Sequence, residues 1–474
     1  MQAHLRDLER DLRAEGFQGE LMMSTIMGGL MGIGALNERP IYTVGSGPAM
    51  APIAAAAFSL AEQLGGNVIV CDTGGTTFDV GLVRDGQLTY SRDTWIGEQW
   101  RGHLLGISSV DIRSIGAGGG SIAWIDDGGL LRVGPQSAGS EPGPACYGRG
   151  GCLPTVSDAA CVLGYFNADA FLGGRMRLDV AAARKSIATL AEQLGRGIEQ
   201  TAYDIVAIAS ELMIKAIHEI TTTEGLNPRE SAIVAGGGAA GLNIMPIAQE
   251  LGCERVLLPC AASALSASGM QFADVVREET ASHYTLSTAF DAAGITAVLD
   301  DHVLRHQAFM TEPAMAGHAA SHIGHVVEAR YAGQVWLIDV AVPEGDLATA
   351  AGQSALFDAF HHAHERIFAI SDPHSAIEFL TWKTRLTVEV PSPPHARRAA
   401  AQGQTRPHTH RRCFFAEGVE AATPVYLASD LAAGHTIPGP AVIEEPTTTL
   451  VVYPGMRVTL SGYGNYLLDT RTEA

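Results

Sequence analysis

The pattern of hydrophobic and polar residues predicts helices and strands along most of this 474-residue chain. Leu5, Leu8 and Leu12 recur at helical spacing and predict an amphipathic helix at the N-terminus. The same spacing predicts helices over residues 180–194 and 202–224. The compact β-branched runs that predict strands cover residues 41–44, 67–71, 78–83, 232–235 and 255–258. We therefore expect the first part of the chain to be α/β.

The pattern changes after about residue 279. Residues 280–390 combine predicted strands at 326–331, 335–342 and 384–390 with one predicted helix at 354–367, and indicate an α+β domain. The next segment is rich in Pro, Arg and His and indicates an exposed loop or linker. The last segment has short strand-like runs punctuated by Gly and Pro, which indicate a small β-rich module. The expected segments are 1–279, 280–390, 391–412 and 413–474.

The segment VIVCDTGGTTFDVGLV, residues 68–83, is the strongest candidate for chemistry. A hydrophobic strand ends in Asp72, turns through a glycine pair and a threonine pair, and returns as a second strand. The turn residues are Gly74, Gly75, Thr76 and Thr77. Paired glycines let backbone N–H groups approach an anion, and an aspartate at a strand end can hold Mg²⁺ beside phosphates. A P-loop or a Rossmann site does not fit, because a strand rather than a helix follows the glycines. The alternative is a plain glycine-rich turn between core strands.

A second glycine turn lies in IVAGGGAAGLNIMPIAQEL, residues 233–251, between a predicted strand and a predicted helix. The turn consists of Gly236, Gly237, Gly238 and Ala239. Glycine there lets the backbone lie against a nucleoside, although αβ units also carry glycine for packing alone.

A third glycine turn lies in SIGAGGGSI, residues 114–122. Its central residues are Gly118, Gly119, Gly120 and Ser121. Such a turn can present several N–H groups to an oxyanion or a phosphate. Upstream, His103 and Asp111 are candidate acid/base or metal-binding groups, and a structural role is the simpler interpretation of His103.

Composition narrows the function classes. The formal net charge of −20 argues against a nucleic-acid-binding or anionic-membrane-binding protein, because both need a basic face. The 54 glycines indicate tight turns and close backbone approaches. Seven cysteines without a C-x-x-C pair indicate a reducing compartment and not a disulfide scaffold. With no signal-peptide-like start and no long apolar run, we expect a cytoplasmic protein without a membrane span.

Several longer stretches occur in one order along the chain: VGSGPA, CDTGGTTFDVGLV, SIGAGGGSIAW, LRVGPQSAGSEPGPACYGRGG, TVSDA, FLGGRM, RYAGQ, IPGPAVIEE and VVYPG. In this order they resemble the A-type subunit of the hydantoinase/oxoprolinase family. The long Gly/Pro stretch between Leu131 and Gly151 is the most specific of them. A sugar-kinase-like or heat-shock-type ATPase would explain the hairpin at Asp72 but not this stretch.

The resemblance implies an actin-like ATPase (ribonuclease H-like) fold over residues 1–279, followed by a β-rich C-terminal region. It implies ATP and Mg²⁺ as cofactors, a carbonyl or lactam substrate that is phosphorylated on oxygen, and a B-type partner subunit in a hetero-oligomer. The hairpin matches the family's second phosphate motif, with Asp79 in the same stretch, and the turn at Gly236 matches its nucleoside-side motif. The candidate catalytic residues are Asp72, Asp79, His103 and Asp111, with Asp72 also the candidate metal ligand.

Two departures from the family pattern affect these expectations. Relatives usually begin with another Gly-Gly-Thr hairpin, whereas this sequence opens in the helix that normally follows it, which implies an N-terminally incomplete ATPase lobe. Asn243 stands where some relatives carry His. The implied activity is ATP-dependent opening of a cyclic amide or ATP-dependent carboxylation. The alternative is a non-catalytic remnant that acts only in subunit assembly.

Overall fold

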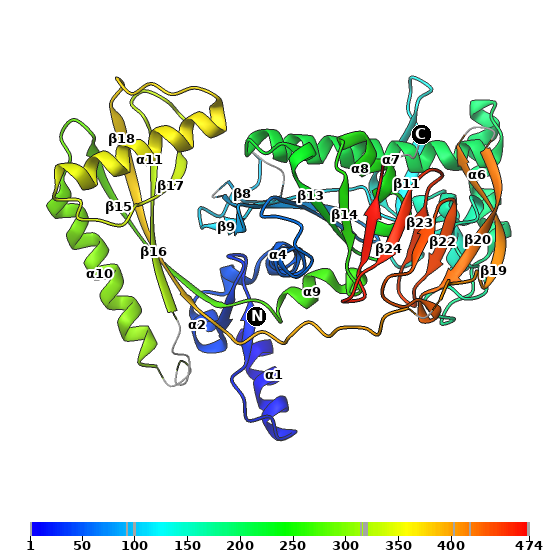
Figure 1. The fold of residues 1–474 in the computed structure, drawn as a ribbon, viewed down its shortest axis with the longest axis horizontal. Helices are drawn as coiled ribbons and strands as arrows, with labels where there is room; N and C mark the ends of the chain where they lie inside the picture. The colour runs from blue at the N-terminus through cyan, green and yellow to red at the C-terminus, as the bar shows by residue number, and fades with distance from the viewer. Residues whose placement is uncertain are drawn as a thin grey trace. The chain divides into compact units, whose positions relative to one another are not determined.

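The computed structural model describes residues 2–91, 93–97, 101–312, 315, 321–401, 403–416 and 419–471. The chain forms two compact units, each assembled from separate stretches of sequence. Unit 1 comprises Met1–Ser46, Thr223–Gly225 and Phe272–Ser392, and unit 2 comprises Gly47–Thr222, Leu226–Gln271 and Pro393–Ala474. Figure 1 shows the elements of both.

Unit 1 is built on a six-stranded sheet. Its strands are β1 (Met22–Ser24), β2 (Leu30–Gly32), β15 (Val275–Leu286), β16 (Ser321–Tyr331), β17 (Ile338–Ala341) and β18 (Ile377–Val388). Their spatial order is β1-β2-β15-β18-β16-β17, and only the β2–β15 pair is parallel. The helices are α1 (Gln2–Ala14), α2 (Ile33–Glu38), η1 (Pro40–Thr43), α10 (Ala292–Met310) and α11 (Ala350–Phe368).

The two long helices of unit 1 share one core with the sheet. Ile295 of α10 and Phe360 of α11 are fully buried with Phe379 and Trp382 of β18. Each helix begins at a side-chain cap, since Asp291 accepts a hydrogen bond from Gly294 N and Thr349 accepts one from Gly352 N. The apolar face of the sheet is therefore covered by α10 and α11 (Figure 1).

Unit 2 is built on a nine-stranded mixed sheet. Its strands are β3 (Val68–Thr73), β4 (Phe78–Arg84), β5 (Gln87–Leu88), β10 (Ile112–Ile115), β13 (Ala232–Gly236), β14 (Arg255–Leu258), β21 (Thr436–Pro438), β24 (Arg457–Leu460) and β25 (Tyr466–Asp469). They follow the order β10-β4-β3-β13-β14-β25-β24-β21, with β5 paired to β4. The central strands β3, β13 and β14 are parallel, which places their carboxyl ends at one edge.

Smaller sheets accompany this one in unit 2. They are β6 (Tyr90–Ser91) with β9 (Ser109–Val110), β7 (Trp95–Ile96) with β8 (His103–Leu104), β11 (Ser121–Ile125) with β12 (Leu131–Ser137), and the four strands β19 (Thr409–Ala416), β20 (Val419–Leu427), β22 (Ala441–Glu444) and β23 (Thr449–Val452). The helices are α3 (Ser46–Ala49), α4 (Ala51–Ala61), η2 (Ala145–Tyr147), α5 (Val156–Val162), α6 (Val180–Leu194), α7 (Ile198–Thr223), η3 (Pro228–Glu230), η4 (Ala240–Leu242), α8 (Ile244–Leu251), η5 (Ala262–Ala264), α9 (Leu265–Gly269) and η7 (Ala428–Asp430).

The two faces of the nine-stranded sheet have different partners. Ile69 and Cys71 of β3 belong to a large core that also contains residues of α5, α6, α7 and α8. Val68 and Val70 alternate with them and point to the other face, against which α4 packs. Figure 1 shows α7 and α8 on one side of this sheet and α4 and α9 on the other. By the same alternation, Asp72 lies on the α4 and α9 side.

Several predicted elements agree with the structure, and others do not. The helix predicted over 180–194 is confirmed as α6, and the next one begins earlier than predicted, at Ile198. The strand predicted over 41–44 is wrong: Pro40 fixes the backbone at the start of a 3₁₀ helix, closed by a bond from Tyr42 N to Arg39 O. The strand predicted over 335–342 forms only over Ile338–Ala341.

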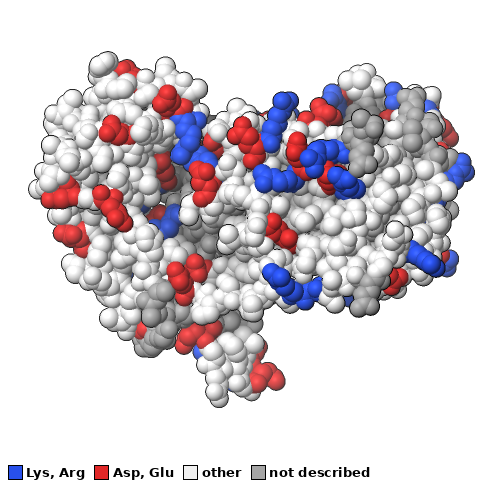
Figure 2. All heavy atoms as spheres, in the orientation of Figure 1, with Lys and Arg blue, Asp and Glu red and all other residues white. Residues whose placement is uncertain are grey.

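The described surface carries mixed charge. Figure 2 shows acidic and basic side chains interspersed among uncharged residues on one face. The residues on that face that are not grey form no continuous basic stripe. Within the described part of the chain, every helix is too short or too polar to pass through a lipid bilayer.

Candidate functional site

The predicted phosphate hairpin is the β3–β4 hairpin of unit 2. Asp72 pairs with Asp79 across the two strands, so both carboxylates project from the same face of the sheet. The turn between them closes with a hydrogen bond of 2.9 Å from Gly74 N to Thr77 O. The two strands on either side are buried because their residues, such as Cys71 and Phe78, fill the core.

The two aspartates are partly buried, and no Lys, Arg or His forms an ion pair with either of them in the described part of the chain. Burial raises the pKa of Asp72, the Ser266 hydroxyl opposes this shift and the Asp79 carboxylate adds to it. Burial also raises the pKa of Asp79, opposed by the hydroxyl of Ser114. Among the described residues, Oδ1 of Asp79 is buried and has no hydrogen-bond partner. An orphaned carboxylate oxygen beside a second carboxylate fits a divalent cation, and Mg²⁺ needs only one or two protein carboxylates when phosphates supply further ligands.

The turn at residues 118–121 packs directly on this hairpin. Gly119 N donates to Gly74 O at 3.0 Å, and Gly120 N donates to Gly75 O at 2.5 Å. A Cβ atom at Gly118 would lie 2.8 Å from Gly74 O, so only glycine fits at this crossing. Ser121 folds back within its own turn and its hydroxyl accepts from Gly118 N at 2.8 Å. The two predicted turns are therefore brought together.

The turn at residues 236–239 packs on the other side of the same hairpin. Ala239 N donates to Thr73 O at 3.1 Å. Gly237 has φ of +90°, and a Cβ atom there would lie 2.1 Å from Thr73 O and 2.7 Å from Oδ1 of Asp72. Only glycine allows both this backbone conformation and this approach. All three predicted glycine turns thus meet around the end of β3.

The Gly/Pro-rich stretch is fixed by one buried carboxylate. Asp158 caps the first turn of α5 together with Thr155. Its oxygens also accept hydrogen bonds from Ala145 N at 3.2 Å and Cys146 N at 2.7 Å. Ser157 N donates to Gly119 O at 2.7 Å. The stretch that gave the most specific family signal therefore has a structural task, which is to hold Tyr147 and α5 against the glycine turns.

A cavity of about 200 Å³ opens where these parts meet. The glycine turns contribute Gly75, Gly119, Gly238 and Ala239 to its lining. An aromatic side is formed by Tyr147, Phe166 and Phe171, whose rings pack with centroids 6.0 Å (Tyr147–Phe171) and 5.0 Å (Phe166–Phe171) apart. A cavity with an apolar wall and glycine turns at one end can hold a ligand that combines a flat ring with anionic groups.

The C-terminal strands supply the remaining wall of the cavity. Glu444 and Glu445 lie at the end of β22, followed by Thr447, Thr448 and Thr449. Thr448 Oγ1 donates to Gly238 O at 3.0 Å, which joins this wall to the glycine turn. Sequence reasoning missed these wall residues and the aromatic side. The available signals were three quoted stretches: IPGPAVIEE ends at Glu445, the Gly/Pro stretch contains Tyr147, and FLGGRM begins at Phe171.

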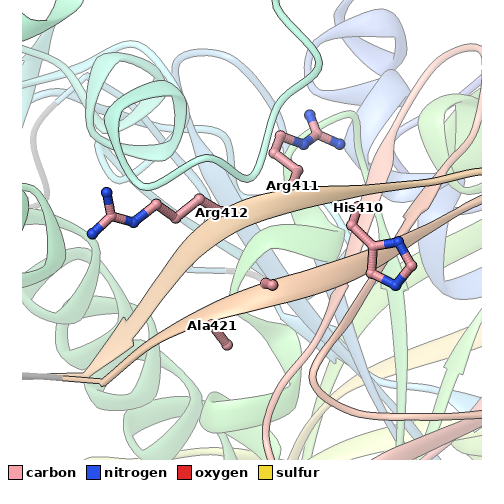
Figure 3. Close-up of a pocket in the computed structure, with 5 residues that line it drawn as sticks. His410, Arg411, Arg412 and Ala421 are labelled. Carbon is pink, nitrogen blue, oxygen red and sulfur yellow. The ribbon is translucent and has the colours of Figure 1, made fainter.

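Glu444 is held from both sides. Asn167 Nδ2 donates to its Oε2 at 3.0 Å, and the guanidinium of Arg411 forms an ion pair with its Oε1. Arg411 also borders a more open pocket of about 360 Å³. This pocket is lined by His410, Arg411, Arg412, Ala421 and Ala422. Figure 3 shows Arg411 and His410 extending from opposite sides of β19. Arg411 is therefore already paired with a residue of the cavity wall.

The remaining candidate residues lie elsewhere in unit 2. His103 is exposed on β8, in the two-stranded β7–β8 ribbon. Asp111 lies between β9 and β10, and burial raises its pKa, with Arg113 opposing. None of the candidate catalytic residues, Asp72 and Asp79 included, lines the cavity, and the catalytic roles of all four stay predictions. Among the described residues, no group of three or more His, Cys, Asp or Glu side chains could hold a metal ion.

Comparison with known proteins explains why these stretches occur together. The sequence profile described as hydantoinase/oxoprolinase matches residues 1–279, and that of the hydantoinase/oxoprolinase C-terminal domain matches residues 296–469. The chain belongs to the hydantoinase/oxoprolinase family. The resemblance inferred from the motifs is thereby confirmed.

Members of this family include ATP-dependent amidohydrolases and carboxylases. The chain is 35% identical to caprolactamase subunit alpha of Pseudomonas jessenii over 448 residues, which is 93% of this chain and 63% of that protein. It is 31% identical to acetophenone carboxylase gamma subunit of Aromatoleum aromaticum, over 97% of this chain and 63% of that protein.

The fold is also similar to a solved structure. The crystal structure of ATP-dependent caprolactamase from Pseudomonas jessenii superimposes with a TM-score of 0.88 at 32% identity, over 99% of this chain and 68% of the other. The chain thus has an α/β fold with mixed sheets like that of this relative, and it spans about 63% of the length of the two curated relatives.

Proposed function

We propose that this chain is the nucleotide-binding part of an ATP-dependent enzyme that phosphorylates a carbonyl or lactam oxygen. The product would be the amino acid formed when water opens the lactam ring, or a carboxylated ketone, made together with a B-type partner subunit. The single observation that carries the proposal is the direct backbone contact of three glycine turns around Asp72. Beside these turns lie two partly buried carboxylates, with which no Lys, Arg or His forms an ion pair in the described part of the chain, and a bound cation would supply the opposite charge.

The nine-stranded unit fits an actin-like ATPase arrangement. In that arrangement a β-hairpin holds the phosphates and a glycine turn after a parallel strand holds the nucleoside. Here β3–β4 would take the first role and the turn after β13 the second. The cavity with its aromatic side would take the nucleobase.

The residues present fit a Mg²⁺–nucleotide complex. Asp72 and Asp79 would hold the cation, directly or through water, as Oδ1 of Asp79 has no other partner among the described residues. When bound, Mg²⁺ would neutralise charge on the phosphate oxygens during transfer.

The chain's own residues contribute mainly position and dipoles. Backbone N–H groups at the tip of the turn, at Gly75 and Thr76, would orient the phosphates, since Gly74 N already donates to Thr77 O, and the glycines keep side chains out of their way. A lactam or ketone oxygen is a poor leaving group, and phosphorylation makes it a good one. Phosphoryl transfer needs little covalent help from the protein, so this construction suits the reaction.

Replacement of Asp72 tests the proposal. In the enzyme reconstituted with its partner, Asp72→Ala should abolish ATP turnover because the cation loses its main ligand, whereas the exposed Asp127→Ala should retain it. Steady-state phosphate release measures both. Turnover of Asp72→Ala at the wild-type level would reject the phosphate-site assignment. A wild-type complex that assembles fully but never turns over ATP would favour a purely structural role in assembly.

A further inference from the structure

Ser266 on α9 contacts the Asp72 carboxylate from a distant part of the sequence. Its Oγ donates to Oδ2 of Asp72 at 2.8 Å, across 194 positions of sequence. Nothing in the glycine motifs points to this residue, because it lies in an alanine- and serine-rich stretch after β14. The contact places a hydroxyl donor on one specific oxygen of the proposed cation ligand.

The short helix that carries Ser266 is held rigidly. A Cβ atom at Gly269 would lie 2.1 Å from Met50 O, so α9 packs against the start of α4 at backbone distance. At its other end, the Leu265 side chain fills the space beside Gly236, where a Cβ atom would lie 2.4 Å from Leu265 Cδ2. Because both ends are packed at this density, the Ser266 hydroxyl has a defined position relative to β3.

The hydrogen bond from Ser266 makes the two oxygens of the Asp72 carboxylate different from each other. Oδ2 accepts from Ser266, whereas no hydrogen bond to Oδ1 occurs within the described part of the chain. Oδ1 lies beside Gly237, the first turn residue after β13. A carboxylate on a strand end can rotate about its last bond, and a donor fixed on one oxygen restricts that rotation. The other oxygen is then presented towards the nucleoside-side turn.

The same segment is bonded to the cavity wall. The hydroxyls of Ser263 and Thr447 are 2.7 Å apart, and Thr447 lines the cavity. Residues 263 to 266 therefore contact both the aspartate at the end of β3 and the wall that would face the nucleotide.

We propose that Ser266 is a positioning residue that fixes the Asp72 carboxylate so that Oδ1 is presented to the divalent cation of the nucleotide complex. This inference rests on the proposed nucleotide site. Ser266 itself need not touch the nucleotide or the cation.

The test compares three serine variants in the full enzyme with its partners, using Mn²⁺ as the probe. Ser266→Ala should weaken Mn²⁺ binding in the presence of ATP about tenfold, since a hydrogen bond to a charged group is lost. Ser266→Thr keeps the hydroxyl and should bind within about twofold of wild type. Ser268→Ala is the matched control, because the Ser268 hydroxyl bonds to Leu265 O in its own helix. Electron paramagnetic resonance of free Mn²⁺ measures the affinity directly, and the KM for Mg²⁺ against kcat gives an independent readout.

Each outcome decides the inference. Unchanged Mn²⁺ affinity in Ser266→Ala would overturn the positioning role. An equal loss of Mn²⁺ affinity in Ser266→Ala and Ser266→Thr would also overturn it, because it would show that the packing of the side chain, and not its hydroxyl, matters. Asp72→Ala separates the two proposals. If it abolishes Mn²⁺ binding while Ser266→Ala does not affect it, only the positioning role fails. If Asp72→Ala also binds Mn²⁺ normally, the nucleotide site itself is wrong.

Discussion

Each unit contains a cluster of charged side chains with restricted access to water, and the two clusters differ in whether an opposite charge is present. In unit 1, Lys383 is 2% exposed and its Nζ lies 3.0 Å from Glu328 and 2.8 Å from Asp339. In unit 2, Asp72 and Asp79 lie beside each other and are partly buried, and no Lys, Arg or His pairs with either of them in the described part of the chain. Both arrangements cost desolvation energy, but only the first compensates it with an opposite charge from the described part of the chain.

The difference distinguishes charged groups that stabilise the fold from charged groups that we expect to bind a ligand. In a buried ion pair in which every charge has its partner, no oxygen is left to bind a ligand. In a partly buried carboxylate pair, an oxygen without a hydrogen-bond partner can bind a cation. The cation would then supply the missing opposite charge. We therefore expect the chemistry in unit 2, and the following changes test this expectation.

Removal of the Lys383 ammonium should have the largest effect on stability. Lys383→Met leaves Glu328 buried without its cation and should destabilise the protein by about 3–5 kcal/mol. Lys215→Met is the control, because its pair with Glu219 is exposed and should change stability by less than about 0.5 kcal/mol. Chemical denaturation measures both. A loss below about 1 kcal/mol in Lys383→Met would show that this ion pair is not the structural element that the comparison requires.

Two adjacent glycines sharpen the comparison within unit 2. Gly237→Ala must place a methyl group 2.1 Å from Thr73 O at a φ of +90°, whereas the nearest atom to a methyl group at Gly238 is 3.8 Å away. Backbone strain alone should cost Gly237→Ala about 1–3 kcal/mol, and the shift of the turn should weaken ATP binding strongly. Gly238→Ala should retain the wild-type fold. Calorimetric titration with ATP measures binding, and equal affinities in the two variants would contradict the role of this turn.

Acid sensitivity of unit 1 provides the last test, and the effect expected from any single histidine is small near neutral pH. His302 Nδ1 and His325 Nδ1 lie 3.0 Å from Thr384 Oγ1, and His306 Nε2 lies 3.0 Å from Thr384 O. Burial lowers the pKa of each of the three histidines. The charged residues that act on them are Arg277, Glu278, Glu279, Asp300, Asp301 and Arg305.

The sign of the pH effect follows from these shifts. The unfolded chain binds protons on histidine near its ordinary pKa of 6.5, while the folded chain resists them. Stability is therefore full above about pH 6.5 and falls on acidification, by at most about 1.4 kcal/mol per pH unit for each histidine. Hydrogen exchange in α10 measures the opening locally. His306→Gln should reduce the acid sensitivity, while the exposed His374→Gln should not, and equal profiles would reject the assignment.

The sequence predicted the local parts of the site better than their assembly. The hairpin at Asp72 and the turns at Gly118 and Gly237 carry strong local signals, because glycine pairs and strand ends are short-range features. Ser266 and Glu444 could not be predicted, since they reach the site only through the packing of α9 and of the C-terminal strands.

Long-range assembly also explains the remaining differences. α10 was not predicted, because its four buried positions, Ile295, Leu299, His302 and His306, include two histidines that do not register as apolar. Unit 1 joins Met1–Ser46 to Phe272–Ser392, and no pattern along the chain reveals such a pairing. β2 pairs with β15 at one residue pair only, Leu30 and Val275. So short a pairing leaves no recognisable pattern in the sequence.

A structure of the full enzyme with a non-hydrolysable ATP analogue and Mg²⁺ tests the central claim most directly. The account predicts the phosphates beside the turn at Gly74 and Gly75, the cation within reach of Asp72 and Asp79, and the base in the cavity beside Tyr147. A nucleotide bound elsewhere, with the Asp72 hairpin packed and free of any anion, would contradict it.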